Sequence, residues 1–383
     1  MDIDVILQGN NIETLKTIPD ESVDSCITSP PYYGLRDYGT GEWVGGDPNC
    51  PHRRMSKYSE KTTTGHKQEE LIGNVGDAIY KTVCPLCGAV REDKQIGLEE
   101  TPEEYIKKLV AVFREVKRIL KPEGTLWVNI GDSYNGNKTG NTEVNKHKGA
   151  VTDSFKKKLW DGAKCKDLIG IPWMLAFALR ADGWYLRQDI IWHKPNPMPE
   201  SVKDRCTKSH EYIFLLSKSP KYYFDYEAIQ EEAICKDDRR AGLGHIDYDG
   251  KRGGNQTSLG QQSFVSISEY RNKRDVWSVI PSHYKEAHFA TFPEELVTPM
   301  VLAGCPKDGI VLDPFMGSGT TGAVAVLNKR HYIGCELNQE YIEMANRRIA
   351  DATKIANQVT FDDLFTDNQT TFDDLLTGSA QTG

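Results

Sequence analysis

Ile27-Thr28-Ser29-Pro30-Pro31-Tyr32-Tyr33 contains the end of an apolar run that begins at Val23. Such a run predicts a short buried strand, and two prolines, which cannot donate to a sheet ladder, bring it to an end. The carbonyl groups beside the prolines are left to accept hydrogen bonds, Ser29 adds a hydroxyl group, and Tyr32 adds an aromatic face. An amino group on a planar heterocycle needs acceptors in its plane and a ring on which to stack. The stretch therefore predicts a site for such a group at the carboxyl end of a strand.

The sequence around this stretch predicts a doubly wound α/β sheet. Strand, Gly-polar turn, helix and strand follow one another over residues 4–27, which is the βαβ order of sheets that carry helices on both faces. In such sheets ligands bind beyond the carboxyl ends of the strands. Seven strands are expected in all, at residues 4–8, 23–27, 125–130, 186–192, 209–216, 309–312 and 332–335.

A second motif lies far downstream, between a predicted strand and a predicted helix. It is Asp313-Pro314-Phe315-Met316-Gly317-Ser318-Gly319-Thr320-Thr321. Its glycines let the backbone pass close to a bound nucleoside, and the N-terminus of the helix after it favours a negative group. Glu336 ends the next strand, at the position where an acidic residue accepts from ribose hydroxyl groups.

The two motifs together resemble those of the DNA amino-methyltransferases, whose catalytic motif is Ser/Asp/Asn-Pro-Pro-Tyr/Phe. In this chain Ser-Pro-Pro-Tyr comes first and the Gly-rich loop last, an order that resembles the circularly permuted beta group. The resemblance implies a class I methyltransferase fold, Rossmann-like and circularly permuted, in which the N-terminal strand lies beside the strand of Glu336. It covers residues 1–38, 101–134, 184–226 and 288–350.

The resemblance also implies roles for individual residues. A base flipped out of duplex DNA would stack on Tyr32, and its amino group would be held by Ser29 and the Pro30 carbonyl. The catalytic set is Ser29, Pro30, Pro31 and Tyr32. The residues expected to bind S-adenosylmethionine are Asn10, Phe292, Asp313, Pro314, Phe315, Gly317, Ser318, Gly319, Thr320, Thr321 and Glu336. The target-base pocket and the DNA contacts are expected at Tyr33, Asp132, Trp192, Lys194, Asn196, Arg239, Arg240, Lys251 and Arg252.

The first residue of the catalytic motif bears on the target base. Serine there is typical of enzymes that methylate N4 of cytosine, and aspartate is typical of those that methylate N6 of adenine. Ser29 therefore favours cytosine N4, with adenine N6 as the alternative and an RNA methyltransferase as a more distant one. The chain has no Pro-Cys dipeptide, the motif of C5-cytosine enzymes, so covalent catalysis is not expected. A non-enzymatic binding module would have no use for both the Gly-rich loop and Glu336.

Residues 40–97 interrupt the α/β pattern and carry two cysteine motifs. One is Cys50-Pro51-His52 and the other is Cys84-Pro85-Leu86-Cys87-Gly88. A Cys-x-x-Cys-Gly knuckle directs two thiolates at one point, and a Cys-x-His could complete a tetrahedral Cys₃His zinc site. We expect structural zinc at Cys50, His52, Cys84 and Cys87, with His66 as the substitute for His52.

The boundaries of the other expected regions are drawn from the amino-acid composition. The catalytic half is expected at 1–39 and 98–226, with a basic loop at 135–166, and the S-adenosylmethionine half at 281–350. Between them, 227–280 is expected to recognise the target sequence, and 351–383 is an acidic tail with a near-repeat.

Charge and hydropathy limit the partners and the location. The net charge is −8, yet residues 138–166 hold eight lysines against three acidic residues, which is compatible with binding duplex DNA. The chain has no apolar run of eighteen residues and no signal pattern, which predicts a cytoplasmic bacterial or phage enzyme without a membrane partner. A cognate restriction nuclease is a further expectation, and monomer and homodimer remain alternatives. The nine scattered cysteines argue against a disulfide framework.

Overall fold

The computed structural model describes residues 1–34, 41–52, 83–93, 95–136, 160–233, 270–281 and 292–358. The chain divides into two compact units. One unit comprises residues 1–30, 109–132 and 170–383, and the other comprises residues 31–108 and 133–169. The predicted insertion at 40–97 and the predicted basic loop at 135–166 both belong to the second unit.

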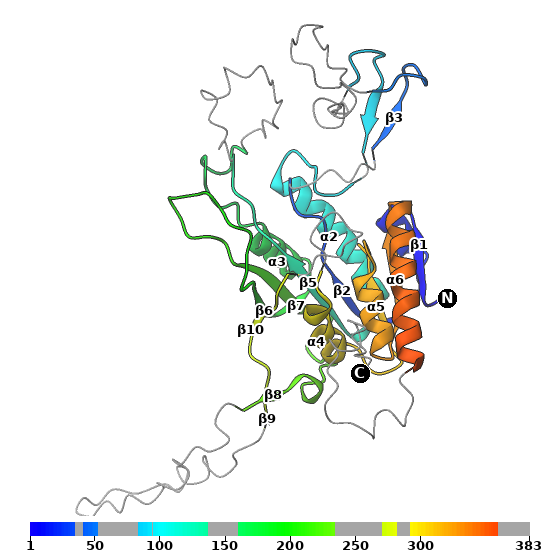
Figure 1. Ribbon diagram of the computed structural model, residues 1–383, viewed down its shortest axis with the longest axis vertical. Helices are drawn as coiled ribbons and strands as arrows, with labels where there is room; N and C mark the ends of the chain where they lie inside the picture. Colours follow the sequence, from blue (N-terminus) through cyan, green and yellow to red (C-terminus); the bar gives the residue numbers. More distant parts are fainter. Residues whose placement is uncertain are drawn as a thin grey trace, which may run out of the picture. The chain divides into compact units, whose positions relative to one another are not determined.

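The first unit is built on an eight-stranded sheet with the strand order β1-β12-β11-β2-β5-β7-β6-β10 (Figure 1). Neighbouring strands are parallel except at β7, which runs antiparallel to both β5 and β6. The strands are β1 (Val5–Gln8), β2 (Val23–Thr28), β5 (Leu120–Ile130), β6 (Tyr185–His193), β7 (His210–Ser217), β10 (Val276–Ser278), β11 (Ile310–Asp313) and β12 (His331–Glu336).

All seven predicted strands are present, and β10 is an addition. Its residues fall in the region expected to recognise the target sequence, where the sequence shows no strand period. β10 pairs with β6 through Trp277 opposite Trp192, and Trp277 is 6% exposed. Burial of one large ring against the sheet is enough to hold a three-residue strand at its edge.

The predicted circular permutation is confirmed by the pairing of β1 with β12. Gln8 lies opposite Glu336, and the Gly9 N–H donates to the Glu336 carbonyl over 2.9 Å. The strand nearest the N-terminus is therefore placed by one that comes more than three hundred residues later.

The helices cover both faces of the sheet, and β7 shows how. Ile213 and Leu215 belong to the main hydrophobic core, whereas Tyr212 and Phe214 contact Trp173 on the opposite face. Successive residues of a strand point to opposite faces, so this alternation makes the sheet doubly wound. Helices α4, α5 and α6 lie together on the face of the main core (Figure 1). The helices are α1 (Asn11–Lys16), α2 (Pro102–Ile119), α3 (Ile171–Ala181), α4 (Glu294–Gly304), α5 (Thr320–Leu327) and α6 (Gln339–Gln358).

Four short strands and one 3₁₀ turn complete the described elements. Strands β8 (Glu231–Glu232) and β9 (Tyr270–Arg271) pair antiparallel after the 3₁₀ turn Glu227–Ile229, and β3 (Glu42–Val44) pairs antiparallel with β4 (Val90–Glu92) in the second unit. Helix α6 continues to Gln358, so the first eight residues of the predicted tail are helical, and the near-repeat lies outside the described residues.

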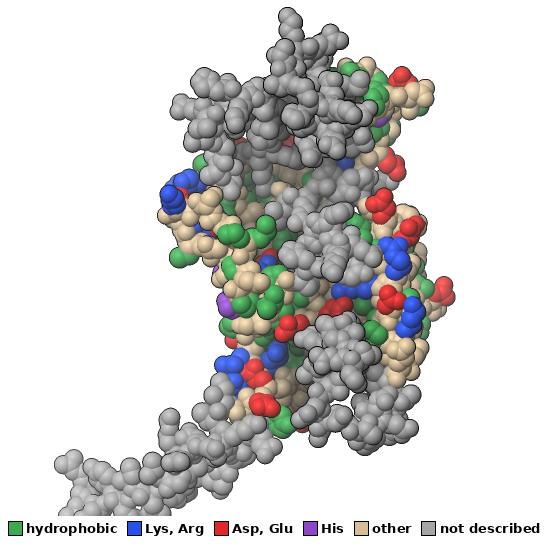
Figure 2. Space-filling model, viewed as in Figure 1, with side chains coloured by type: hydrophobic (Ala, Val, Ile, Leu, Met, Phe, Trp, Pro, Cys, Tyr) green, Lys and Arg blue, Asp and Glu red, His purple; other side chains and the backbone are tan. Residues whose placement is uncertain are grey.

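In the part of the chain that the structure describes, none of the helices combines the length and the apolar character that a membrane crossing requires. On the face shown in Figure 2, the described acidic and basic side chains are interspersed rather than gathered by sign.

The last turn of α4 packs on a buried polar cluster, and this contact depends on glycine. A Cβ at Gly304 would lie 2.5 Å from Trp127 Nε1 and 3.0 Å from Thr125 Oγ1. The Gly304 carbonyl accepts from Thr125 Oγ1 over 3.3 Å, so the helix cannot move away without losing that bond.

We therefore expect Gly304→Ala to lower the free energy of unfolding by roughly 1–3 kcal/mol, as overpacked core sites do. Glu295→Ala, at an exposed position of the same helix, is the control. Denaturant unfolding measures both. A Gly304→Ala protein as stable as the control would show that the cluster relaxes without cost.

Candidate active site and cofactor loop

Ser29 follows β2 directly and is half-buried at the carboxyl edge of the sheet. Because β2 and β5 are parallel, with Thr28 opposite Val128, the next residues along each strand are neighbours. Ser29 Oγ lies 3.2 Å from Asn129 Oδ1. The Asn129 side-chain nitrogen donates to the Tyr212 carbonyl over 3.2 Å and to Glu211 Oε2 over 3.4 Å.

These contacts fix the direction of the serine hydroxyl. The Tyr212 carbonyl and the Glu211 carboxylate can only accept, so they face the NH₂ group of Asn129 and turn its carbonyl toward Ser29. Ser29 must then donate to Asn129. Its proton is engaged, and its lone pairs are left to accept from a ligand.

A partly buried ion pair supports the far end of this network. Lys194 Nζ pairs with Glu211 Oε1, and the two side chains are 19% and 14% exposed. Lys194 Nζ also lies 4.2 Å from the centre of the Trp192 ring. One ion pair and two hydrogen bonds therefore connect Lys194 to Ser29 through Glu211 and Asn129.

The part of the catalytic motif that begins at Pro31 belongs to the second unit. The Pro31 carbonyl accepts from the Tyr105 hydroxyl over 2.8 Å, whereas no donor among the described residues reaches the Pro30 carbonyl. Tyr33, expected in the base pocket, is 4% exposed, and its hydroxyl donates to the Glu100 carbonyl over 3.0 Å. Burial, with the nearby Glu99 carboxylate, raises the pKa of Tyr33 to about 12. Tyr32 is half-buried.

Asp313 begins the Gly-rich loop and is 3% exposed. Its carboxylate accepts from Thr28 Oγ1 over 2.6 Å and from Thr321 Oγ1 over 2.7 Å, and from the Phe315 N–H over 3.0 Å. Burial raises the pKa of Asp313 to about 6 despite these three donors. This side chain joins β2, the loop and helix α5.

Glu336 closes the other side of the loop. Its Oε2 accepts from the Gly317 N–H and its Oε1 from the N–H groups of Leu337 and Asn338, each over 2.9 Å. Burial raises the pKa of Glu336, although these backbone donors oppose the shift. The carboxylate is thus oriented at the end of β12, where the sequence predicts the ribose contact.

Other predicted cofactor residues are placed as follows. Asn10 caps α1 by accepting from the Ile12 N–H over 3.0 Å. Phe292 packs against the main core. Gly319 has φ +82°, and a Cβ there would lie 2.7 Å from Ala345 Cβ, so α5 and α6 approach closely only because this residue is glycine. Pro314 and Gly317 stay in the loop between β11 and α5.

The predicted base-pocket and DNA residues are less concentrated. Asp132 accepts from the N–H groups of Gly170 and Ile171 over about 3.0 Å and so caps α3. Trp192 is buried in the main core, and its indole N–H donates to the Val279 carbonyl. Asn196 is exposed after β6. The four predicted DNA-contact arginine and lysine residues lie outside the described residues, namely Arg239, Arg240, Lys251 and Arg252.

The four predicted metal ligands converge. One ligand atom from each of Cys50, His52, Cys84 and Cys87 lies within 4.8 Å of the others. The Cys50 and Cys84 sulfurs are 3.7 Å apart, and Cys87 Sγ is 3.6 Å from His52 Nδ1. A tetrahedral site with zinc–sulfur bonds of about 2.3 Å needs sulfurs separated by roughly 3.8 Å. His66 lies outside the described residues.

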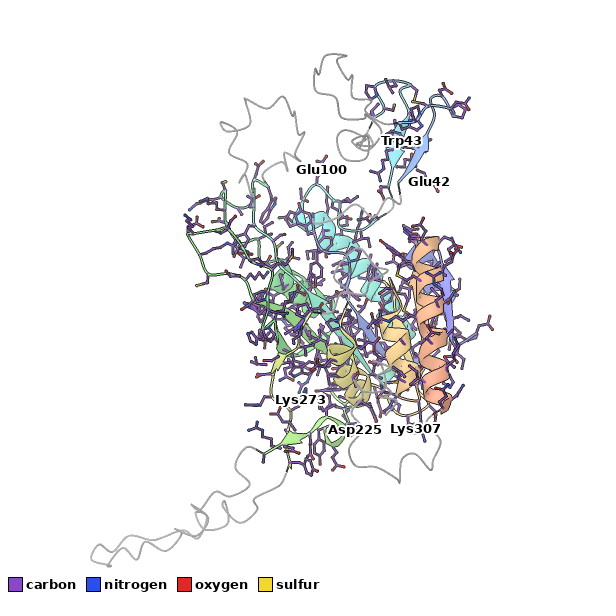
Figure 3. The ribbon with its side chains drawn as sticks, in the orientation of Figure 1. Glu42, Trp43, Glu100, Asp225, Lys273 and Lys307 are labelled. Atoms are coloured by element: carbon purple, nitrogen blue, oxygen red, sulfur yellow. The ribbon has the colours of Figure 1, made fainter. Side chains whose placement is uncertain are left out.

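Local backbone and ring contacts hold this cluster in shape. The Gly88 N–H donates to the Cys84 carbonyl, and the Cys84 N–H donates to the Ala89 carbonyl, each over 2.8 Å. Trp43 on β3 (Figure 3) stacks on the His52 ring at 4.4 Å. The residues present therefore fit zinc in number, type and spacing.

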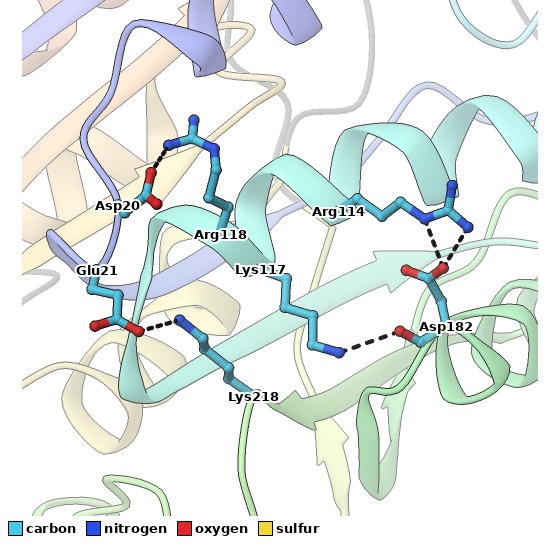
Figure 4. Close-up of a pocket in the computed structure, with 7 residues that line it drawn as sticks. All are labelled: Asp20, Glu21, Arg114, Lys117, Arg118, Asp182 and Lys218. Atoms are coloured by element: carbon cyan, nitrogen blue, oxygen red, sulfur yellow. Dashed lines mark hydrogen bonds and ion pairs between the residues drawn. The ribbon is translucent and has the colours of Figure 1, made fainter.

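A hollow of about 620 Å³ lies elsewhere (Figure 4). Its lining comes from the turn before β2 (Asp20 and Glu21), from α2 (Arg114, Lys117 and Arg118), and from Asp182 and Lys218, which follow α3 and β7. Its cations are already satisfied within the protein: Arg114 pairs with Asp182, Arg118 with Asp20, and Lys218 with Glu21, while Lys117 donates to the carbonyls of Asp182 and Gly183. We assign it a structural role.

Four residues that contact the predicted site residues were not expected from the sequence. They are Thr28, Asn129, Glu211 and Arg348. Glu211 stands in the His-Glu-Tyr-Ile run that resembles a pocket segment, which is the one available signal. The others are polar residues inside regular strand or helix patterns.

The sequence and the fold of this chain are similar to those of known proteins. A family model described as DNA methylase, of the N6/N4 type, matches residues 23–347. Type II methyltransferase M.Cfr9I of Citrobacter freundii is 40% identical over 344 residues, which is 90% of this chain and 87% of the relative. Type II methyltransferase M.SmaI of Serratia marcescens is 40% identical over 345 residues, 90% of each. The structure of PvuII DNA methyltransferase (cytosine-N4-specific) has a TM-score of 0.51 at 16% identity, covers 94% of this chain and 93% of its own, and so shares the fold.

The chain belongs to the N6/N4 DNA methylase family. It is an S-adenosylmethionine-dependent methyltransferase that acts on DNA.

The raised pKa of Asp313 predicts a measurable pH dependence. A carboxyl group whose pKa is about 6 when folded, against about 3.9 when unfolded, stabilises the fold below pH 4 and loses that contribution as the pH rises through 6. Relative to Asp313→Asn, the wild type should therefore lose roughly 3 kcal/mol of unfolding free energy between pH 4 and 7. Urea unfolding without cofactor measures this. Exposed Asp351→Asn should follow the wild type, and a constant difference for Asp313→Asn would contradict the assignment.

Proposed function

We propose that this enzyme transfers a methyl group to N4 of a flipped cytosine in duplex DNA. The observation that supports this most directly is Ser29 at the first motif position, with its proton engaged by Asn129. A serine oriented in this way can accept from an exocyclic amine. The fold shared with a cytosine-N4-specific enzyme is consistent with the proposal, and adenine N6 is the alternative.

The proposed chemistry depends on the positions of two hydrogen-bond acceptors. Two acceptors are needed for an NH₂ group, and Ser29 Oγ and the Pro30 carbonyl are adjacent in the chain. Accepting from both hydrogens draws the nitrogen lone pair out of conjugation with the ring. The Tyr32 ring would hold the base flat, so that the nitrogen is also positioned for the transfer.

S-adenosylmethionine supplies a methyl group on a sulfonium centre, and the nitrogen displaces the sulfur in line. The new N–C bond forms as the S–C bond breaks, and the methylated amine then loses one proton to solvent. Glu336 would hold the ribose, and the Gly-rich loop would pass under the nucleoside. This direct transfer needs no cysteine nucleophile.

We also propose that zinc binds Cys50, His52, Cys84 and Cys87 and has a structural role. Four protein ligands leave no open position for chemistry. The strand pair β3 and β4 has little buried apolar surface nearby, since Val44, Val83 and Val90 are about half exposed. A bound metal would therefore supply folding free energy. A cognate restriction nuclease is proposed as partner on the strength of the Type II relatives.

The first experiment is to incubate the protein with varied duplex DNA and labelled S-adenosylmethionine, digest the DNA, and identify the nucleoside by mass spectrometry. N4-methylcytosine is expected. N6-methyladenine would keep the mechanism and discard the cytosine assignment. If DNA stays unlabelled while RNA is methylated, the DNA assignment is wrong for this chain.

In the same assay, Ser29→Ala should lower the rate at least 100-fold, as the loss of one positioned hydrogen bond does. Tyr32→Ala should also lower the rate strongly, because it removes the ring on which the base stacks. Binding of S-adenosylmethionine, measured by calorimetry, should survive in both. Ser22→Ala, just before the amino-terminal end of the same strand, is the control. Full activity in both variants would show that the base pocket is misassigned.

For the metal, elemental analysis of the purified protein should find about one zinc per chain. Cys87→Ser should fall below about half an equivalent and lose thermal stability. Cys165→Ser, an exposed cysteine outside the cluster, should keep the full zinc content. Wild-type protein with less than half an equivalent would exclude the four-ligand site.

A further inference from the structure

Among the described residues, Arg348 on α6 forms hydrogen bonds with Glu294, Ser318 and Thr320, which come from two other segments. Its side chain is 10% exposed. The Nε and Nη2 groups donate to Glu294 Oε1 over 3.2 and 2.6 Å. The Nη1 group donates to Thr320 Oγ1 over 2.7 Å and to Ser318 Oγ over 3.3 Å. One planar group thus holds a carboxylate and two hydroxyl groups.

The segments that Arg348 joins are those to which the cofactor is assigned. Ser318 and Thr320 belong to the Gly-rich loop and the first turn of α5. Glu294 is the first residue of α4 and follows Phe292 and Pro293 directly. The two segments are separated by more than twenty residues of helix and strand, so their relative position is set by tertiary contacts.

The close approach of α5 and α6 brings the guanidinium to this point. A Cβ at Gly319 would lie 2.7 Å from Ala345 Cβ, and Arg348 follows Ala345 by three residues on the same helix face. The shape of the loop and the position of Arg348 are therefore parts of one packing arrangement.

Electrostatics makes the arginine and the glutamate a unit. Arg348 Nη1 reaches the first residue of α5, where the helix dipole is positive and a cation alone is unfavourable. Glu294 neutralises the guanidinium, and a nearly buried charge requires such a partner. Lysine could not replace arginine, because a single ammonium group lacks the planar set of donors that reaches both sides.

We propose that Arg348 is a positioning residue for S-adenosylmethionine. It fixes the Ser318 and Thr320 hydroxyl groups and the start of α4, so that the Gly-rich loop has its binding shape before the cofactor arrives. Arg348 touches neither the target base nor the methyl group. The proposal rests on the cofactor role assigned to this loop, and it is independent of which base is methylated.

The test is Arg348→Gln in the full-length protein, with calorimetric binding of S-adenosylmethionine and steady-state methylation as readouts. We expect the Kd and KM for S-adenosylmethionine to rise at least tenfold while kcat stays within threefold. Lys354→Gln, which removes a positive charge from an exposed position of the same helix, should change neither. Thr320→Val should raise Kd as well, and the double variant should be less affected than the two single effects combined.

Two results would overturn the proposal. A lower melting temperature with an unchanged Kd would mean that Arg348 only packs α6 against its neighbours. A lower kcat with an unchanged KM would mean that it acts in the transition state. Should Arg348→Gln fail to fold, Arg348→Lys, which keeps the charge without the planar set of donors, decides through its Kd. Because calorimetry needs no DNA, a wrong target base would leave this test intact.

Discussion

The hydrogen bond between Thr28 and Asp313 is the contact on which the rest of the site depends. It joins the residue before Ser29 to the first residue of the Gly-rich loop over 2.6 Å, across 285 positions of sequence. The same carboxylate holds Thr321 on α5 and the Phe315 N–H. A nucleophile and a methyl donor must meet in one geometry, and this buried carboxylate fixes the two half-sites relative to each other.

The cost of that contact is visible in the pKa of Asp313. Three donors lower the pKa of a carboxyl group, yet burial raises it to about 6. The enzyme keeps a group that is not optimal for stability at neutral pH because no apolar side chain could bind two threonine hydroxyls and a backbone N–H at once. Arg348 and Glu294 follow the same principle on the other side of the loop, with opposite charges in place of a lone carboxylate.

Motifs with fixed spacing were predictable from sequence, and contacts between distant segments were not. The seven strands, the Gly-rich loop and the position of Glu336 follow from hydrophobic periodicity and from Gly and Pro residues, and the convergence of three cysteines and a histidine follows from the knuckle spacing. Asn129 and Arg348 stand at ordinary positions of a strand and a helix, where sequence gives the face but not the partner. Trp192 and Tyr33 show a second difficulty. Both rings are buried, and the sequence does not distinguish an aromatic side chain that packs in the interior from one that contacts a ligand.

The pairing of residues 5–8 with 333–336 has a consequence for how the chain acquires its fold. During synthesis, the first strand leaves the ribosome long before its partner exists. Its N–H and C=O groups stay unpaired until residues 333–336 have been made, and contacts of such long sequence separation form slowly. A strand without its partner exposes backbone groups that invite pairing with another chain. A cofactor-competent sheet therefore forms only after β11 and β12, the last two strands along the described chain, have been made.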